Sequence, residues 1–271
     1  MSEPIAGQPI HTRIWQEEPE ADNPFATRVA RCHGYDVYGD MLGKAGWIDM
    51  LYLLFRGEAP TSREARLFEA LAVALANPGP RDASVHAAMC SGTCGSPAAA
   101  ALMAALAVGA GQLGGGREIL LAVDNWQACG TDLDAWRCRL QAPPVDEKIS
   151  AWPRPEHPPG FDPHGVHIAG IVADSLSRLA ALSPGRHLLW LAGQREMLEG
   201  MAGLPLSLSG IAAAAFVDLG FTAPQAEMAY LLLRLPGAAV HALEQQEYGH
   251  KQFPFYDIEF DRQPATMEAE S

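Results

Sequence analysis

Two imidazoles stand close together in a loop whose backbone is tightly constrained. The loop runs Pro158-Pro159-Gly160-Phe161-Asp162-Pro163-His164-Gly165-Val166-His167. Proline fixes φ and glycine reaches φ values that other residues avoid, so this run predicts a shaped turn rather than a flexible linker. A histidine side chain can exchange a proton near neutral pH and can donate a hydrogen bond to oxygen. His164 and His167 are therefore the first candidates for chemistry.

A second candidate group lies near the carboxyl end of the chain. Arg234 and His241 are seven residues apart, so they share one face of a predicted helix. A guanidinium group can bind a carboxylate through two parallel hydrogen bonds, which makes Arg234 a candidate ligand for an acidic substrate. The alternative is a structural ion pair with Glu227 or Glu244. We expect His241 and Glu244 to form a structural pair.

The cysteines do not predict a metal site or disulfide bonds. Five cysteines, an odd number, are scattered through a chain long enough to build its own core, so reduced thiols are expected. His86, Cys90 and Cys94 recur every four residues and would share a helix face. Gly92 weakens that helix, and no fourth ligand follows at a motif spacing. We therefore expect no bound metal.

The pattern of apolar residues and breakers predicts an all-α protein. Thr61 with Glu64, and Thr222 with Gln225, have the spacing of a capping box, in which two side chains bind two backbone N–H groups at a helix start. Residues 1–28 are polar and proline-rich and are expected to form an arm, and no strand-like alternation of useful length is found. The predicted helices are about 36–55, 61–76, 97–110, 117–140, 168–182, 184–201, 210–219 and 222–247, the last with a kink at Pro236-Gly237.

Composition excludes several classes of function. The chain has 271 residues, 48% of them hydrophobic, and a net charge of −13 without any cluster of Lys or Arg. A nucleic acid or an anionic membrane surface is therefore not an expected partner. The longest apolar run, 98–110, is shorter than the roughly 20 residues that span a bilayer, and the N-terminus has no signal-like core. We expect a cytoplasmic protein.

Six short motifs follow one another in a recognisable order, and together they resemble the citrate synthase superfamily. By length the chain resembles its short citryl-CoA lyase-like branch. The motifs are His33-Gly34-Tyr35-Asp36-Val37, Leu53 to Thr61, Gly111 to Gly116, Pro159 to His167, Gly203-Leu204-Pro205-Leu206, and Arg234-x-x-Gly237-x-x-x-His241-x-x-Glu244.

This resemblance implies an all-α fold in which a small helical domain is inserted into a large one, with the site in the cleft between them. The large domain would comprise residues 1–116 and 210–271, and the small domain residues 117–209. The resemblance also implies a homodimer, or a heteromer with a citrate synthase-like subunit. No tightly bound cofactor is expected, and a coenzyme A thioester or a small carboxylate is the implied ligand.

The resemblance assigns roles to particular residues, and the chain departs from the family at two of them. His164 matches the histidine that polarises the keto group, and Arg234 matches a carboxylate-binding cation. His167 is either a second imidazole of the site or a residue at a helix start. The catalytic aspartate falls on Ser209, whose hydroxyl cannot act unaided as a carboxylate base. The enol-stabilising histidine falls on Gly114, where Gln112 is the nearest polar side chain.

Three functional hypotheses follow. The first is an enzyme that cleaves or forms a C–C bond between an acyl-CoA and a 2-oxo acid, with His164 and Ser209 as catalytic residues and Arg234, His167 and Gln112 in substrate binding. The second is a catalytically inactive paralogue that serves as a partner subunit. The third is a protein that binds or senses a small carboxylate.

Overall fold

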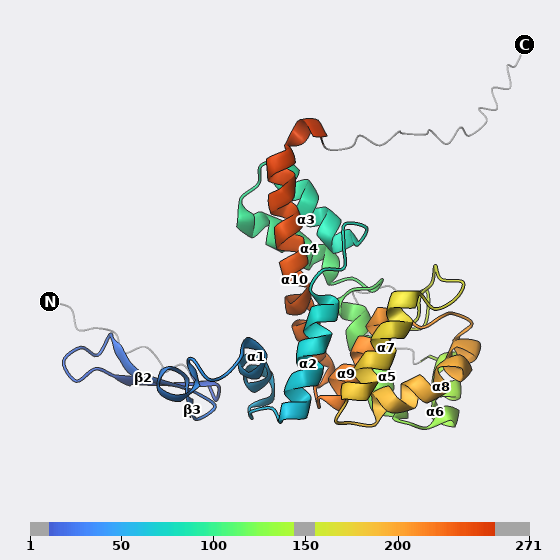
Figure 1. Ribbon diagram of the computed structural model, residues 1–271, viewed down its shortest axis with the longest axis horizontal. Helices are drawn as coiled ribbons and strands as arrows, with labels where there is room; N and C mark the ends of the chain where they lie inside the picture. Colours follow the sequence, from blue (N-terminus) through green and yellow to red (C-terminus); the bar gives the residue numbers. More distant parts are fainter. Residues whose placement is uncertain (1–10, 144–154, 253–271) are drawn as a thin grey trace, which may run out of the picture.

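A computed structural model describes residues 11–143 and 155–252. Helices make up most of the described chain, which confirms the predicted all-α class (Figure 1). They are α1 (Trp47–Arg56), α2 (Ser62–Leu75), α3 (Ala83–Thr93), α4 (Ala98–Gly109), α5 (Gly116–Cys129), α6 (Leu133–Gln141), α7 (Gly170–Leu182), α8 (His187–Ala202), α9 (Leu208–Asp218) and α10 (Ala223–Tyr248), with short turns of helix at Val37–Met41 and His250–Gln252.

The expected arm contains a small antiparallel sheet, so the prediction that the chain has no strands is wrong. The strands are β1 (Trp15–Pro19), β2 (Thr27–Cys32) and β3 (Tyr35–Asp36), in the order β1-β2-β3. Glu18 pairs with Arg28 and Arg31 across the first two strands. His33 and Gly34 connect β2 to β3 with φ values of 48° and 90°, as in tight hairpin turns. The strands are too short and too polar to show as an alternating pattern.

A cluster of aromatic and aliphatic side chains forms the main core. Tyr52 of α1, Phe68 of α2, Phe216 of α9 and Phe221 pack with ring centroids 5.3–6.4 Å apart. Helix α9 lies at the centre of this core, and its alanines at 212–215 are all fully buried. Their small side chains allow neighbouring helices to approach closely.

A second, smaller core joins α3, α4 and the upper half of α10, away from the main body (Figure 1). It consists of Val85, Ala88, Ala101, Ala105, Ala238 and Ala242. Helix α10 links the two cores and runs as one element through Pro236, where a kink was expected. The backbone N–H of Gly237 donates to the carbonyl oxygen of Ala76 at 2.7 Å. The division into domains at residues 117 and 209 stays a prediction.

Two predicted helices differ from the structure. The helix expected at 36–55 begins only at Trp47, after the short helical turn Val37–Met41, and the helix expected at 117–140 is divided in two. Residues 117–140 form α5 and α6, because Gly130 has φ of 51° and the Asp132 side chain accepts hydrogen bonds from the backbone of Asp134 and Ala135. Trp126 and Trp136 then pack edge to face, with ring centroids 4.8 Å apart. In the described ranges, no helix is long and apolar enough to cross a bilayer. The cytoplasmic location stays a prediction.

Candidate functional site

The site is built around Glu118, a buried carboxylate in the first turn of α5. Its side chain is almost completely buried. One oxygen, Oε1, accepts hydrogen bonds from the Ser209 hydroxyl at 2.5 Å and from the backbone N–H of Gly160 at 2.9 Å. The other, Oε2, accepts the backbone N–H of Gly114 at 2.5 Å. Glu118 thus joins two of the motifs that carried the family resemblance, the glycine turn and the proline-rich loop, to the start of α9.

The glycine turn brings Gly114 to this carboxylate. Gly114 has φ of 67°, which a side chain would strain, and a Cβ on Gly115 would lie within 3 Å of the carbonyl oxygens of Gly109 and Gly111. The turn can therefore close only with glycine at these positions. Helix α5 begins directly after it at Gly116.

The proline-rich loop is pinned to the segment before α9. Phe161 forms an isolated antiparallel bridge with Leu206, and the backbone N–H of Asp162 donates to Pro205 at 2.8 Å. The N–H of Ser207 donates back to Gly160 at 3.1 Å. The loop is therefore a fixed part of the site, as its composition predicts.

Two hydroxyl groups extend from Glu118 toward the surface. The Oγ of Ser209 lies 2.6 Å from the Oγ of Ser207. Ser209 is buried and Ser207 is half-buried. Ser207 also caps α9, because its hydroxyl accepts the N–H of Gly210. Ser209 was a candidate from the sequence, and its role stays a prediction; the structure shows Glu118 and Ser207 as its hydrogen-bond partners.

His157 is a second buried residue that sequence reasoning missed. Its side chain is nearly inaccessible, and its Nε2 lies 3.8 Å from Oε2 of Glu118. Within the part of the chain that the structure describes, neither ring nitrogen has a hydrogen-bond partner. The sequence signal for Glu118 was weak, because an acidic residue in the first turn of a helix is common. His157 had none, because its burial depends on distant elements.

Arg234 lies in the same region, and its guanidinium group is already bound to other groups of the protein. It donates to Asp82 and, at 2.5 Å, to the carbonyl oxygen of Gly114. Its ion-pair partner is thus Asp82 rather than Glu227 or Glu244. The hydroxyl of Tyr230 also donates to Gly114, at 2.9 Å. Burial, reinforced by the charges of Glu118 and Asp82, raises the pKa of Tyr230 to about 12 despite the opposing charge of Arg234.

The remaining predicted site residues lie at or near the surface. The His164 and His167 side chains are exposed, and the backbone N–H of His164 donates to Asp162 at 2.9 Å. Gln112 is half-buried in the glycine turn. His241 pairs with Glu244 at 3.3 Å, the pairing expected from the sequence. The structure therefore joins Ser209, the base of the His164 loop and Arg234 through Glu118 and Gly114.

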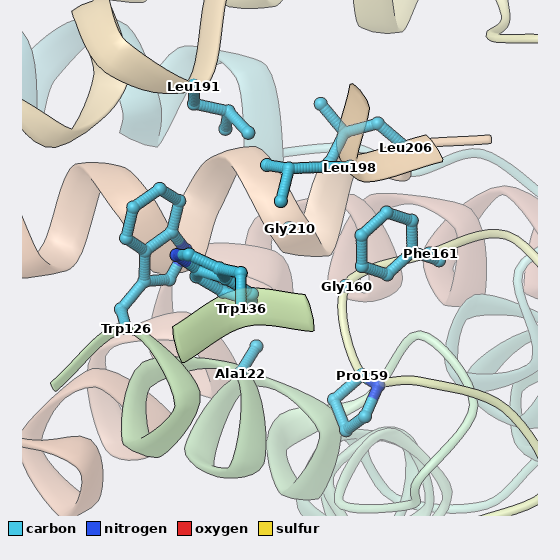
Figure 2. A pocket seen from close by; sticks show the side chains of 10 residues that line it. All are labelled: Ala122, Trp126, Trp136, Pro159, Gly160, Phe161, Leu191, Leu198, Leu206 and Gly210. Carbon is cyan, nitrogen blue, oxygen red and sulfur yellow. The ribbon is translucent and has the colours of Figure 1, made fainter. Parts of the chain in front are cut away.

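The space beneath the loop is apolar and nearly filled. Figure 2 shows Pro159, Gly160 and Phe161 on one side of this cavity and Trp126 and Trp136 on the other. Its volume of about 10 Å³ admits about one water molecule. A ligand of the size of coenzyme A does not fit there. Among the residues that the structure describes, no three His, Cys, Asp or Glu side chains are grouped to hold a metal ion.

No protein-family model and no curated protein match this sequence. Solved structures do. Citryl-CoA lyase from Hydrogenobacter thermophilus matches with a TM-score of 0.71 at 20% identity, covering 94% of this chain and 95% of that chain. ATP citrate lyase from Methanothrix soehngenii, in complex with citrate and coenzyme A, matches with a TM-score of 0.70 at 17% identity.

That match covers all of this chain but 44% of the ATP citrate lyase chain. Citrate synthase from Thermoplasma acidophilum matches with a TM-score of 0.53 at 16% identity, over 82% of this chain and 60% of that chain. The chain therefore has the citrate synthase-like helical fold, and it resembles citryl-CoA lyase over nearly the full length of both. These matches confirm the resemblance drawn from the ordered motifs.

Proposed function

We propose that this protein breaks, or in reverse forms, the C–C bond that joins an acyl-CoA to a 2-oxo acid, as in the cleavage of citryl-CoA. The observation that carries the proposal is the buried carboxylate of Glu118, bound to Ser209. The family resemblance places a catalytic aspartate at position 209, so a carboxylate is present at that point of the fold although it comes from another helix. The fold likeness to citryl-CoA lyase supports the same reaction class.

The other groups fit this chemistry to different degrees. His164 is exposed on a pinned loop, where an imidazole can reach the keto oxygen of a bound acid. His167 and Gln112 remain predicted substrate contacts. A substrate carboxylate would bind Arg234 only by displacing or joining Asp82, its present partner.

The direct test is release of coenzyme A. The purified protein is incubated with citryl-CoA, and in a second reaction with acetyl-CoA plus oxaloacetate or other 2-oxo acids. We expect acetyl-CoA from the first reaction or free thiol from the second, at a rate that His164→Ala lowers at least about tenfold. Equal product formation with and without protein would contradict the proposal.

A second candidate is a non-catalytic partner subunit. The internal neutralisation of Arg234 by Asp82 and the lack of a side chain at Gly114 favour it, because both remove groups that the reaction uses. If this is the function, the chain alone is inactive in both assays and raises the activity of a co-purified citrate synthase-like subunit. A small-carboxylate sensor would instead show a thermal shift with citrate and no turnover.

We propose that the protein assembles as a homodimer through α4 and α10. No charged residue lies between Pro97 and Gly116, although the whole chain carries a net charge of −13. The outward face of α4 includes Met103, which is 62% exposed, and that of α10 includes Val240 and Leu243, both more than half exposed. The part of this face on α4 carries no charged residue, which permits two acidic chains to associate there with little charge repulsion.

A further inference from the structure

Resting on the proposed function, we propose that Glu118 and His157 are the acid–base pair of this site and that they act on the substrate through the hydroxyls of Ser209 and Ser207. The four side chains form a connected path. It runs from half-buried Ser207 through buried Ser209 to Glu118 and then to His157. No other carboxylate meets Ser209 among its described contacts.

The direction of the hydrogen bonds follows from counting protons. Ser209 has one hydroxyl proton, and it donates that proton to Oε1 of Glu118. Its Oγ must therefore accept the proton of Ser207 across the 2.6 Å contact. Both hydroxyl groups therefore donate in the direction from the surface to the buried carboxylate. Glu118 can take up a proton along these hydrogen bonds without contacting the substrate.

His157 is the part of this arrangement that a purely structural role leaves unexplained. Three donors on Glu118 would suffice to hold the glycine turn, the loop and α9 together. Among the described residues, neither nitrogen of this buried imidazole has a hydrogen-bond partner. A buried polar group left unsatisfied costs roughly 1–3 kcal/mol, so its presence calls for an explanation. Its position 3.8 Å from the Glu118 carboxylate lets it accept a proton after a small movement of the ring.

Glu118 and His157 also lie beside the two positions at which this chain lacks the catalytic aspartate and histidine that the family resemblance implies. Ser209, the position of the absent aspartate, binds one oxygen of Glu118, while Gly114, the position of the absent histidine, binds the other. His157 approaches this second oxygen. A carboxylate and an imidazole are therefore both present, supplied by different segments of the chain.

The proposed step moves protons and no other atoms. The C–H bond α to the thioester carbonyl breaks and its electron pair stays on the substrate as the enolate. The Ser207 oxygen receives the proton, the former Ser207 proton passes to Ser209, and the former Ser209 proton passes to Oε1 of Glu118. Rotation of the protonated carboxyl group turns this O–H toward His157, and transfer of its proton to Nε2 then gives a carboxylate and an imidazolium. In the cleavage direction the same path runs backwards and protonates the enolate.

The test measures exchange of the α-hydrogens of acetyl-CoA in D2O by mass spectrometry, which requires no second substrate. We expect exchange by the wild type and a loss of about 100-fold or more in Glu118→Gln, since general-base catalysis contributes about 10²- to 10⁴-fold. His157→Gln and Ser207→Ala should each lose about tenfold or more. Glu244→Gln, which removes an exposed carboxylate on α10, is the matched control and should exchange like the wild type.

Two further variants separate catalysis from folding. Ser207→Ala interrupts the path at its surface end and leaves the three hydrogen bonds of Glu118 in place, so it remains informative if Glu118→Gln fails to fold. The double variant Glu118→Gln/Ser209→Asp returns the carboxylate to position 209 and should recover exchange relative to Glu118→Gln.

The outcomes distinguish this pair from the proposed function. Suppose that the wild type exchanges hydrogen and releases coenzyme A, and that the three variants Glu118→Gln, His157→Gln and Ser207→Ala do so equally well. The assignment of Glu118 and His157 as the acid–base pair is then wrong, and the proposed function stands. If the wild type does neither, the proposed function fails and the pair fails with it.

Discussion

Three buried charges in the described part of the chain, Glu118, Arg234 and Asp218, are each surrounded by several hydrogen-bond donors or acceptors. Glu118 accepts three hydrogen bonds, and Arg234 binds both Asp82 and the carbonyl of Gly114. Asp218 is fully buried and accepts from Ser183, from the ring of His187 and from two backbone N–H groups at the start of α8. A buried charge without such partners would cost several kcal/mol, so these contacts are required for folding.

Asp218 makes stability depend on pH. Burial alone would raise its pKa, but the hydrogen bonds from His187, Ser183 and the backbone outweigh burial and hold the pKa below its ordinary value. Its contribution is therefore complete above the unfolded pKa of about 4 and is lost as the pH falls through the lower folded pKa. Asp218→Asn should lower the free energy of unfolding by about 2–3 kcal/mol at pH 7 and flatten its fall in acid. Urea unfolding of both proteins from pH 7 downward measures this, and parallel pH curves would contradict it.

Arg234 stabilises the junction between α10, the glycine turn and the start of α3. Arg234→Met leaves the Asp82 carboxylate partly buried without its ion partner, so we expect a loss of about 3 kcal/mol in the free energy of unfolding. Arg137→Met is the control, because Arg137 pairs with Asp134 at the surface and should change stability by less than about 0.5 kcal/mol. Equal effects in denaturant titrations would show that Arg234 is not structural and would strengthen its predicted role in carboxylate binding.

At the scale of the elements, the helices approach closely where glycine or alanine faces a neighbouring backbone. Gly92 of α3 lies against Ala242 of α10, and a Cβ there would overlap the Ala242 carbonyl group. Gly193 of α8 has no atom within 4 Å of the corresponding point. Glycine therefore permits close packing of α3 against α10, whereas in α8 it contacts no neighbouring element.

These two glycines give opposite expectations for one substitution. Gly92→Ala should lower the free energy of unfolding by about 1–3 kcal/mol, because α3 and α10 must move apart. Gly193→Ala should raise it by about 0.5–1 kcal/mol, because alanine is the better helix former and meets no neighbour. Thermal and urea unfolding of the two variants measure the difference. A gain in stability for Gly92→Ala would show that α3 and α10 do not pack as described.

At the scale of the whole molecule, the proposed homodimer rests on apolar side chains that α4 and α10 expose. The core between α3, α4 and α10 consists of small side chains, five of them alanine. A helix that is apolar on all sides, such as α4, normally lies buried. A second copy on this face would bury what the single chain leaves exposed.

The homodimer is tested by placing a charge on that face. Val240→Glu puts an acidic side chain in the apolar stripe of α10 and should convert the dimer to a monomer in light scattering coupled to size exclusion. Val73→Glu, on the exposed side of α2, is the control and should leave the mass unchanged. A wild type that is monomeric at micromolar concentration, or a Val240→Glu protein that stays dimeric, would contradict this interface.

Local patterns were sufficient to predict most of the helices and the fold class. The capping boxes at Thr61 and Thr222 are present as predicted, because a cap depends on residues three positions apart. The family resemblance rested on short motifs in order, and the match to citryl-CoA lyase confirms it. The small sheet of residues 15–36 was missed because its strands are short and polar and pair through the backbone.

The composition of the site was decided by contacts between distant segments. The sequence offered Ser209 and Arg234 as candidates, and their roles stay predictions. Glu118 lies 91 positions from the hydroxyl that it binds, and the Asp82 that neutralises Arg234 is 152 positions away. Burial of His157 likewise follows from packing of the whole chain. Backbone preferences depend on residues only a few positions apart, so helices and their caps can be predicted from the sequence. The partner of a buried charge is chosen by the fold, because the cost of leaving that charge unpaired appears only once water is excluded.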